Sequence, residues 1–294
     1  TTSTGHGIGM VAQGLNFNKG DNIIIPEREF WNNSYPWLNL QEKGVEIRLV
    51  KLNKDNSFDP EAIEKLIDNK TRVVAIAAVR FNSGFRPNLA AIGKIAHSKG
   101  ALFVVDAAQG AGMVPIDVEK DNVDIMAGCG SEWLLGMHGT GFLYVSNRVV
   151  KMIKPTLPGM YAAEIVYDEL SFYDDARKFE TGSIAFALFD AWSVGLQLII
   201  DIGVENIYET ALEKTDLIIN GLQEKGYQII TPIKKREERT AIVHFNAGSL
   251  EATKTLFKKL SDNKVLLTLQ GEHIRVSPNF FTTKEEIDVF LNLI

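Results

Sequence analysis

The hydrophobic positions follow one pattern in the first half of the chain. Short, continuously apolar runs alternate with stretches whose apolar residues recur at helical spacing. Continuous runs predict strands covered on both faces, which is typical of a parallel sheet. The predicted strands are 22–26, 45–52, 73–79, 101–106, 124–127 and 141–145. The predicted helices include 8–15, before the first strand, and 59–69 and 89–99. We therefore expect an α/β fold with a doubly covered sheet, in which ligands sit at the carboxyl ends of the strands.

After Gly182 the pattern changes to that of an α+β unit. Two long helices are predicted at 184–202 and 204–226, and shorter elements follow them. The later strands are predicted at 228–231, 240–246, 265–269 and 273–277, with helices at 250–261 and from 283 onward. This predicts a large domain over 1–183, a connecting helix over 184–204 and a small C-terminal domain over 205–294. Because the chain opens at Thr1 inside a functional-looking loop, we expect part of the large domain to precede it.

Charge and composition exclude several classes of function. A net charge of −6 over 294 residues, without a cluster of lysines and arginines, argues against nucleic-acid binding. No apolar run has membrane-spanning length, because Asp190 and Asp201 interrupt the longest candidate. The single cysteine, Cys129, permits no intrachain disulfide and fits a reducing, cytoplasmic compartment. The expected partners are therefore small molecules.

Asp106 is the strongest individual candidate for chemistry. It ends a buried apolar strand, where a carboxylate is costly unless it is paired. A pyridinium nitrogen would be a suitable partner and would act as an electron sink; alternatively, Asp106 caps the next turn. Gln109, three residues on, could reach the 3-oxygen of such a ring.

Two further segments have a functional and an ordinary interpretation. Residues 1–7 are rich in hydroxyls and glycine and lead into a helix, so they could cradle a phosphate or only cap the helix. Residues 29–37 carry four aromatics, and one of them could cover a flat heterocycle. A core or dimer-interface cluster is the alternative, and we prefer it for Trp37.

Six segments in order carry a resemblance to a known family. They are the Ser/Thr/Gly loop at 2–7, Glu-Phe…Asn…Tyr-Pro-Trp at 29–37, Asp-Ala-Ala-Gln at 106–109, Trp-Leu-Leu-Gly…Gly-Thr-Gly at 133–141, Lys-Phe-Glu-Thr-Gly-Ser at 178–183, and Ile-Arg-Val-Ser-Pro at 274–278. Together they resemble class V of the fold-type-I enzymes that use pyridoxal phosphate (PLP). This group contains cysteine desulfurases, selenocysteine lyases and isopenicillin-N-epimerase-like proteins. The resemblance spans essentially the whole chain and implies a mostly parallel sheet covered by helices, a smaller C-terminal domain and a homodimer.

The resemblance also implies a role for each matching residue. Thr4 and Gly5 would hold the phosphate, Phe30 would stack on the ring, Asp106 would pair with the ring nitrogen, Gln109 would contact the 3-hydroxyl, Ser183 would reach the partner subunit's phosphate, and Arg275 would clamp the substrate α-carboxylate. Cys129 stands where relatives offer a hydroxyl to the phosphate. The alternative for Arg275 is a surface salt bridge.

The chain departs from the family where the cofactor is usually anchored. Relatives read Ser-Gly-His-Lys, whereas this chain reads Cys129-Gly130-Ser131-Glu132. The lysine forms a Schiff base with PLP and moves the substrate proton, and a glutamate cannot replace it in the first role. A negative charge near the phosphate should also weaken binding of an anionic cofactor. In addition, the last 165 residues contain no cysteine, where a desulfurase carries its nucleophile.

Three functions are compatible with this departure. The chain could be a non-catalytic dimeric binding or scaffold protein. It could instead be an enzyme that holds PLP or pyridoxamine phosphate (PMP) noncovalently and acts on a small amino acid or amino sugar, with Glu132 or His138 as the base. The third possibility is that Glu132 is an artificial substitution in an enzyme with the lyase, transaminase or epimerase chemistry of its relatives. One engineered substitution would not explain why Ser131 and Cys129 also differ from the family. We therefore expect a class V homologue that is not a conventional PLP catalyst.

Overall fold

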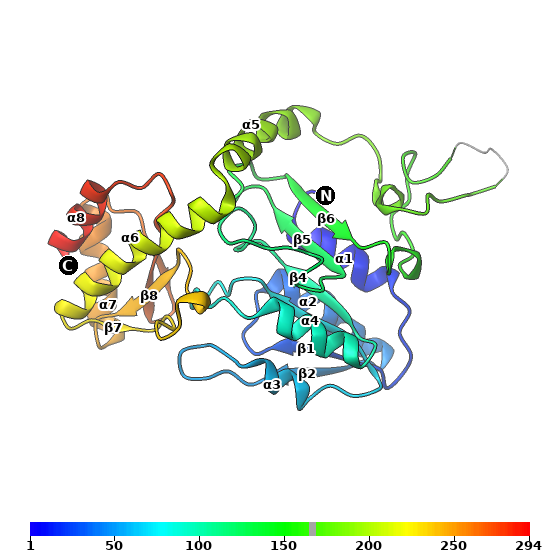
Figure 1. Ribbon diagram of the computed structural model, residues 1–294, viewed down its shortest axis with the longest axis horizontal. Coiled ribbons are helices and arrows are strands. Elements are labelled where there is room, and N and C mark those ends of the chain that lie inside the picture. The colour runs from blue at the N-terminus through cyan, green and yellow to red at the C-terminus, as the bar shows by residue number, and fades with distance from the viewer. Residues whose placement is uncertain (165–168) are drawn as a thin grey trace.

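The computed structural model describes residues 1–164 and 169–294, and its centre is a six-stranded sheet (Figure 1). The strand order is β2-β1-β3-β4-β5-β6. The strands are β1 (Asn22–Pro26), β2 (Glu46–Val50), β3 (Thr71–Ala77), β4 (Leu102–Asp106), β5 (Ile125–Cys129) and β6 (Gly141–Val145). The first five run parallel, and β6 pairs antiparallel with β5. The predicted mostly parallel sheet is therefore confirmed.

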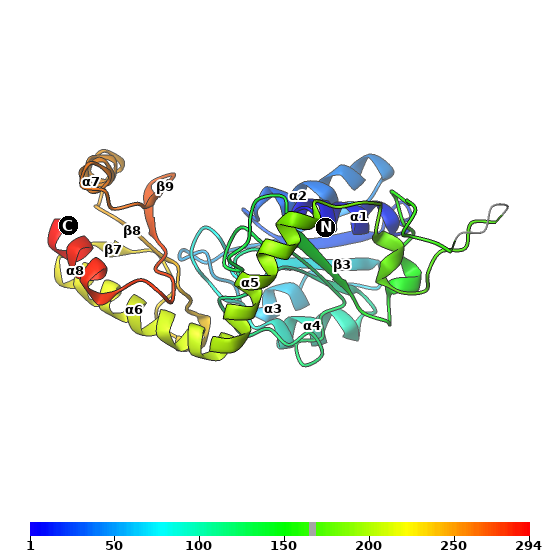
Figure 2. The same ribbon diagram turned by 90° about the horizontal axis from the view of Figure 1, so that it is seen from above.

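Helices cover both faces of this sheet, as the continuous apolar strands predict. Figure 2 shows α1 (Thr4–Gly14) and α2 (Trp31–Leu38) on one face, and α3 (Pro60–Glu64) and α4 (Leu89–Ser98) on the other. Alternate residues of β1 enter the two cores: Ile23 belongs to the α1 side and Ile24 to the α4 side. Trp37 of α2 is fully buried in the first core, in keeping with the structural role preferred for it.

The observed elements differ from the predicted ones in a few places. Helix α1 begins at Thr4 rather than Ile8, because Ser3 caps it by accepting the N–H of His6. Helix α2 lies in a stretch that was predicted only as an aromatic cluster, since its aromatics and an internal Pro36 give little helical signal. The helix predicted over 59–69 is the short α3 alone.

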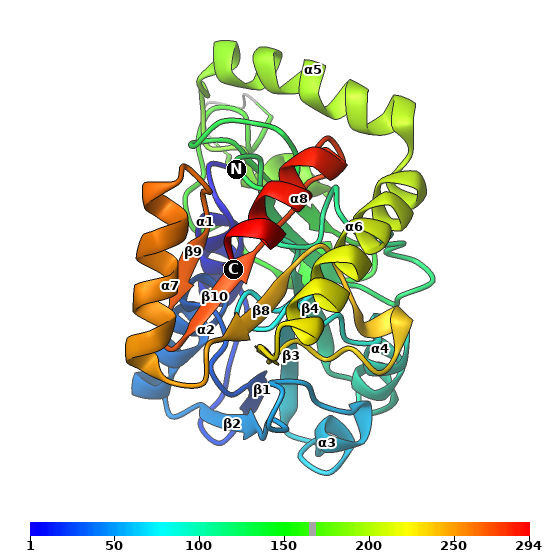
Figure 3. The same cartoon turned by 90° about the vertical axis from the view of Figure 1, so that its left-hand side faces the viewer.

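The C-terminal part has its own sheet and core. Its strands are β7 (Gln228–Ile229), β8 (Val243–Asn246), β9 (Thr268–Gln270) and β10 (His273–Val276), in the antiparallel order β7-β8-β10-β9. Helices α6 (Val204–Glu224), α7 (Leu250–Asp262) and α8 (Lys284–Leu293) pack around this sheet (Figure 3). Short 3₁₀ segments lie at Asn39–Lys43, Val150–Met152, Ala176–Phe179 and Arg236–Glu238.

Helix α5 (Phe186–Ile202) leads from the large sheet to α6 (Figure 1). Gly203 lies between the two helices with a φ of 85°, a conformation that favours glycine. In the described part of the chain, no single helix is long and apolar enough to cross a membrane. Helices α5 and α6 reach that length and composition only as a pair, and they are bent by 79°.

The two parts of the chain are joined by close contacts beside the large sheet. The hydroxyl of Thr240 donates to the carbonyl of Gly84 at 2.8 Å. Gly84 has a φ of 70°, and a Cβ there would lie 2.2 Å from the carbonyl oxygen of Ile242. The large-sheet loop and the segment before β8 therefore meet backbone to backbone, which fixes β10 near the ends of the parallel strands.

Candidate active site

A cavity of about 340 Å³ lies at the carboxyl ends of the parallel strands. The start of α1, the segments that follow β1, β3, β4 and β5, and one residue of β10 contribute its lining. It brings together most of the residues singled out from the sequence: Thr4, Phe30, Asp106, Gln109, Cys129, Glu132, His138 and Arg275. Gly5 and Ser183 do not line it. Gly5 faces Asn32 instead, and Ser183 is exposed before α5.

Asp106 is almost completely buried at the end of β4. One carboxyl oxygen accepts the backbone N–H of Ala108 at 2.9 Å. Burial raises the pKa of Asp106 to about 7, and the negative charges of Glu29 and Glu132 add to this effect. The carboxyl group is therefore close to half protonated near neutral pH and would gain from a cationic partner.

Gln109 connects the two parts of the chain at the cavity. Its amide oxygen accepts from the indole Nε1 of Trp133 at 3.0 Å and from Nη2 of Arg275 at 2.8 Å. Both bonds use the oxygen, so the amide Nε2 remains available as a donor. Arg275 is held further by Ser277, whose Oγ accepts from Nε at 2.8 Å. Burial lowers the pKa of Arg275, and Glu132 opposes that shift.

The start of α1 provides donors to another part of the cavity wall. The hydroxyl Oγ1 of Thr4 is buried and has no oxygen or nitrogen partner among the described residues; its polar neighbour is the thiol of Cys129. The first N–H groups of a helix have no partner within the helix, and its N-terminus favours an anion. Cys129 also lines this region, and burial raises the pKa of its thiol.

A buried ion pair supports the aromatic wall of the cavity. Glu29 and Arg80 are both buried, and their charged atoms lie 3.4 Å apart. One oxygen of Glu29 accepts the N–H of Phe30 at 2.9 Å, and the other accepts the N–H of Ala77 at 3.2 Å. Phe30 packs edge-on against Phe81, with ring centroids 5.0 Å apart. The pair thus ties the segment after β1 to β3 and fixes the backbone of Phe30.

Glu29 and Arg80 were not singled out from the sequence. Glu29 directly precedes the aromatic segment and Arg80 follows an apolar strand, so each carried a weak signal alone. Their pairing depends on β1 and β3 being neighbours in the sheet, which the order of the strands along the chain did not reveal.

Glu132 lies in the turn that follows β5. It is exposed and lines the cavity, and it forms no side-chain hydrogen bond or ion pair with any described residue. No lysine occurs among the described residues that line this cavity. Gly130, two residues earlier, packs tightly: a Cβ there would lie 2.1 Å from Oγ1 of Thr140. The turn that carries Glu132 is therefore closely fixed at its base.

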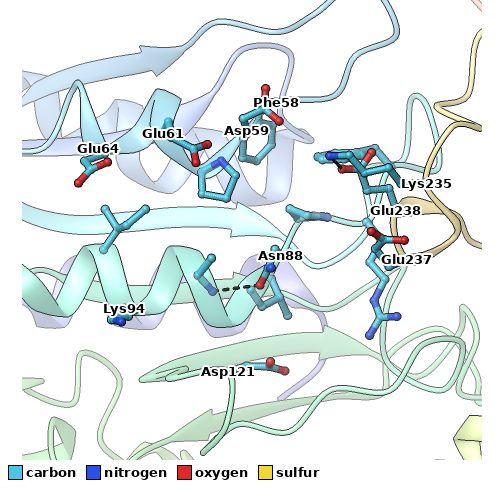
Figure 4. Close-up of a pocket in the computed structure, with 17 residues that line it drawn as sticks. Phe58, Asp59, Glu61, Glu64, Asn88, Lys94, Asp121, Lys235, Glu237 and Glu238 are labelled. Atoms are coloured by element: carbon cyan, nitrogen blue, oxygen red, sulfur yellow. Dashed lines mark hydrogen bonds and ion pairs between the residues drawn. The ribbon is translucent and has the colours of Figure 1, made fainter.

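A larger, open hollow of about 650 Å³ lies elsewhere on the large sheet (Figure 4). It is lined by α3, α4 and the 235–238 segment, and none of the residues predicted for the site belongs to it. Its acids are dispersed: Glu61 and Glu64 lie apart from Glu237 and Glu238 in Figure 4. Within residues 1–164 and 169–294, no group of three histidines, cysteines or acids could hold a metal ion. This hollow therefore offers no converging chemistry.

The sequence profile of the aminotransferase class-V family matches residues 1–290. The chain belongs to this family. A relative in the class-V family, a probable cysteine desulfurase from Methanothermobacter thermautotrophicus, is 30% identical over 98% of this chain and 76% of its own length. The family and its structural neighbours are PLP-dependent.

Solved class-V structures share the fold at lower identity. The apo cysteine desulfurase from Thermococcus onnurineus NA1 has a TM-score of 0.91 at 24% identity, over 100% of this chain and 77% of its own. A lysine-to-alanine mutant of C-DES, with glycine covalently linked to its PLP cofactor, has a TM-score of 0.91 at 22% identity, over 99% of this chain and 78% of its own. These likenesses support the fold-type-I architecture.

Proposed function

We propose that this class-V protein binds PLP or PMP noncovalently and does not use conventional Schiff-base catalysis. One observation carries the proposal: the cavity gathers the side chains suited to a pyridine ring, while Glu132, and no described lysine, lines it. Position 132 is where the family resemblance places the anchoring lysine.

The residues around Asp106 fit a flat, protonated ring. The carboxyl group of Asp106 has a free oxygen beside its bond to Ala108, and its raised pKa favours a cationic partner. Phe30 offers a ring face held by Glu29. The free Nε2 of Gln109 is suited to donate to the 3-oxygen.

The start of α1 fits the phosphate. Oγ1 of Thr4 is a buried hydroxyl without an oxygen or nitrogen partner, at the N-terminus of an eleven-residue helix. Gly5 adds a backbone N–H there, and Ser183 would act from a second subunit. Glu132 and the thiol of Cys129 make the cavity less favourable for an anionic cofactor than a lysine and a hydroxyl would, so we expect weaker binding than in lysine-bearing relatives.

A bound PLP or PMP would supply an electron sink to a substrate carbon. In this chain Arg275 would orient a substrate carboxylate, for which its forked guanidinium is well shaped. Glu132 or His138 would move a proton, since both line the cavity and are exposed. The substrate class supported by these groups is a small amino acid or amino sugar.

The test is a titration of the purified protein with PLP, followed by borohydride. We expect a change in the visible spectrum on binding, and we expect the cofactor to dialyse away after borohydride treatment. A covalently retained cofactor would show that another amine takes the place of the lysine. An unchanged spectrum, with no binding of PMP in calorimetry, would leave only the scaffold function.

The second candidate is a non-catalytic homodimer, and the surface of α5 favours a dimer in either case. Phe186, Val194 and Ile200 of this helix are 64%, 72% and 69% exposed. An exposed apolar surface of this kind is typical of an interaction site. We expect a dimer in sedimentation equilibrium, and Val194→Glu should shift it toward monomer. A native monomer would contradict the homodimer.

A further inference from the structure

Arg275 is a partly buried cation that forms no ion pair with any described residue; only the more distant charge of Glu132 acts on it. Its two side-chain bonds go to the neutral Gln109 and Ser277. No described carboxylate lies within 4.0 Å of its guanidinium. Removing a guanidinium from water is costly unless an anion compensates it, so the cavity favours an anionic group at this point.

Glu132 is the complementary case on the wall of the same cavity. The two other lining carboxyl groups have partners or are protonated. Glu29 is paired with Arg80, and Asp106 accepts from Ala108 at a raised pKa. Glu132 has no hydrogen-bond or ion-pair partner among the described residues; it is exposed to water, and its charge acts on Arg275 from beyond ion-pair distance. The wall of the cavity therefore carries one cation and one anion, and neither forms an ion pair with a described residue.

These two charges do not neutralise each other directly. Glu132 and Arg275 both line the cavity, but no ion pair within 4.0 Å joins them. A ligand that carries an anion and a cation on neighbouring atoms would satisfy both. An α-amino acid in its zwitterionic form has this arrangement, with a carboxylate suited to the guanidinium fork and an ammonium suited to a carboxylate.

We propose that Glu132 binds the ammonium group of a free α-amino acid whose carboxylate is held by Arg275. The proposal deepens the proposed function, because it assigns a ligand to the same cavity, and its cofactor would be PMP or PLP. Glu132 then replaces the covalent role of a lysine with an ionic one. A neighbouring carboxylate favours the protonated amine, so Glu132 orients this group and the proton transfer of the proposed function is left to His138.

The experiment is calorimetry with L-alanine on the cofactor-free protein and on the protein saturated with PMP. PMP carries an amine, so it does not condense with alanine and only noncovalent binding is measured. Propionate is the matched probe that lacks the ammonium group. We expect alanine to bind native protein about tenfold more tightly than propionate, and Glu132→Gln to abolish that preference. Arg275→Gln should weaken both ligands.

Glu272→Gln is the control, because Glu272 is exposed, lies outside the cavity and gives the same change in charge. It should leave both affinities unchanged. Glu132 is exposed, so its substitution should not impair folding. Equal weakening of alanine and propionate by Glu132→Gln, or no binding of alanine at all, would overturn the proposal. If PMP binds but Glu132→Gln does not change alanine binding, this proposal is wrong and the proposed function stands. If alanine binding depends on Glu132 but PMP does not bind, this proposal stands and the proposed function is wrong.

Discussion

Glu132→Lys is expected to convert noncovalent cofactor binding into covalent attachment. The native chain should lose all its PLP after borohydride and dialysis, whereas the variant should retain it stoichiometrically. The physical reason is that the cavity already holds the groups suited to the ring, so that an amine on the turn after β5 needs only to reach the aldehyde. Replacing an anion with a cation next to the phosphate also favours an anionic cofactor.

Mass spectrometry of borohydride-treated protein measures this directly and locates the modified residue. Glu272→Lys is the matched control, because it introduces the same charge change at an exposed position outside the cavity. It should show only the background labelling of surface lysines. If Glu132→Lys binds PLP but remains unmodified, position 132 is not the counterpart of the anchoring lysine.

Asp106→Asn should change how the free energy of unfolding depends on pH. In the folded chain the pKa of Asp106 is raised from 3.8 to about 7, chiefly by burial. Below pH 3.8 the carboxyl group is protonated in both the folded and the unfolded chain, so it does not lower the free energy of unfolding. As the pH rises from 3.8 to about 7, the unfolded state releases this proton and the folded state keeps it, so stability falls. The full loss is on the order of 4 kcal/mol above that window.

Asparagine does not titrate, so the variant should be spared this loss. Urea denaturation of both proteins without cofactor, at about pH 4 and about pH 8, should show the variant gaining up to about 4 kcal/mol relative to the native chain between the two conditions. A difference that is independent of pH would contradict the raised pKa.

The same substitution should weaken cofactor binding, because the neutral amide of asparagine cannot form an ion pair with a pyridinium. PMP affinity should then fall by at least about a hundredfold.

Much of the fold could be predicted from hydrophobic pattern. β1 and β6 occur where their apolar runs predicted them, and α4 ends one residue short of its predicted end. The pattern could not give the strand order or the direction of β6. The antiparallel β6 is as apolar as its parallel neighbours, and its direction goes with the helix-free connection over residues 130–140, which makes no crossover of the kind that parallel strands need. The domain limits at 183 and 204 remain a prediction.

The candidate site was less accessible from sequence than the fold. Asp106 stood out because a charge at the end of an apolar strand needs an explanation. Arg275 lies 166 positions from its partner Gln109, and no local pattern connects them; only the family resemblance suggested its role. Gly5 and Ser183 were assigned by the same resemblance and lie outside the cavity lining. Their proposed contacts depend on a backbone N–H and on a second subunit.

The amide oxygen of Gln109 accepts two hydrogen bonds and so connects the two parts of the chain. One donor, Trp133, belongs to the large-sheet part, and the other, Arg275, belongs to the antiparallel sheet. A carboxylate arriving at Arg275 would compete with that oxygen for the guanidinium, and any displacement of β10 would strain the same bond. Occupancy of the carboxylate position would thus be transmitted to the ring's 3-oxygen through one amide, which would make the colour of a bound cofactor a reporter of ligand arrival.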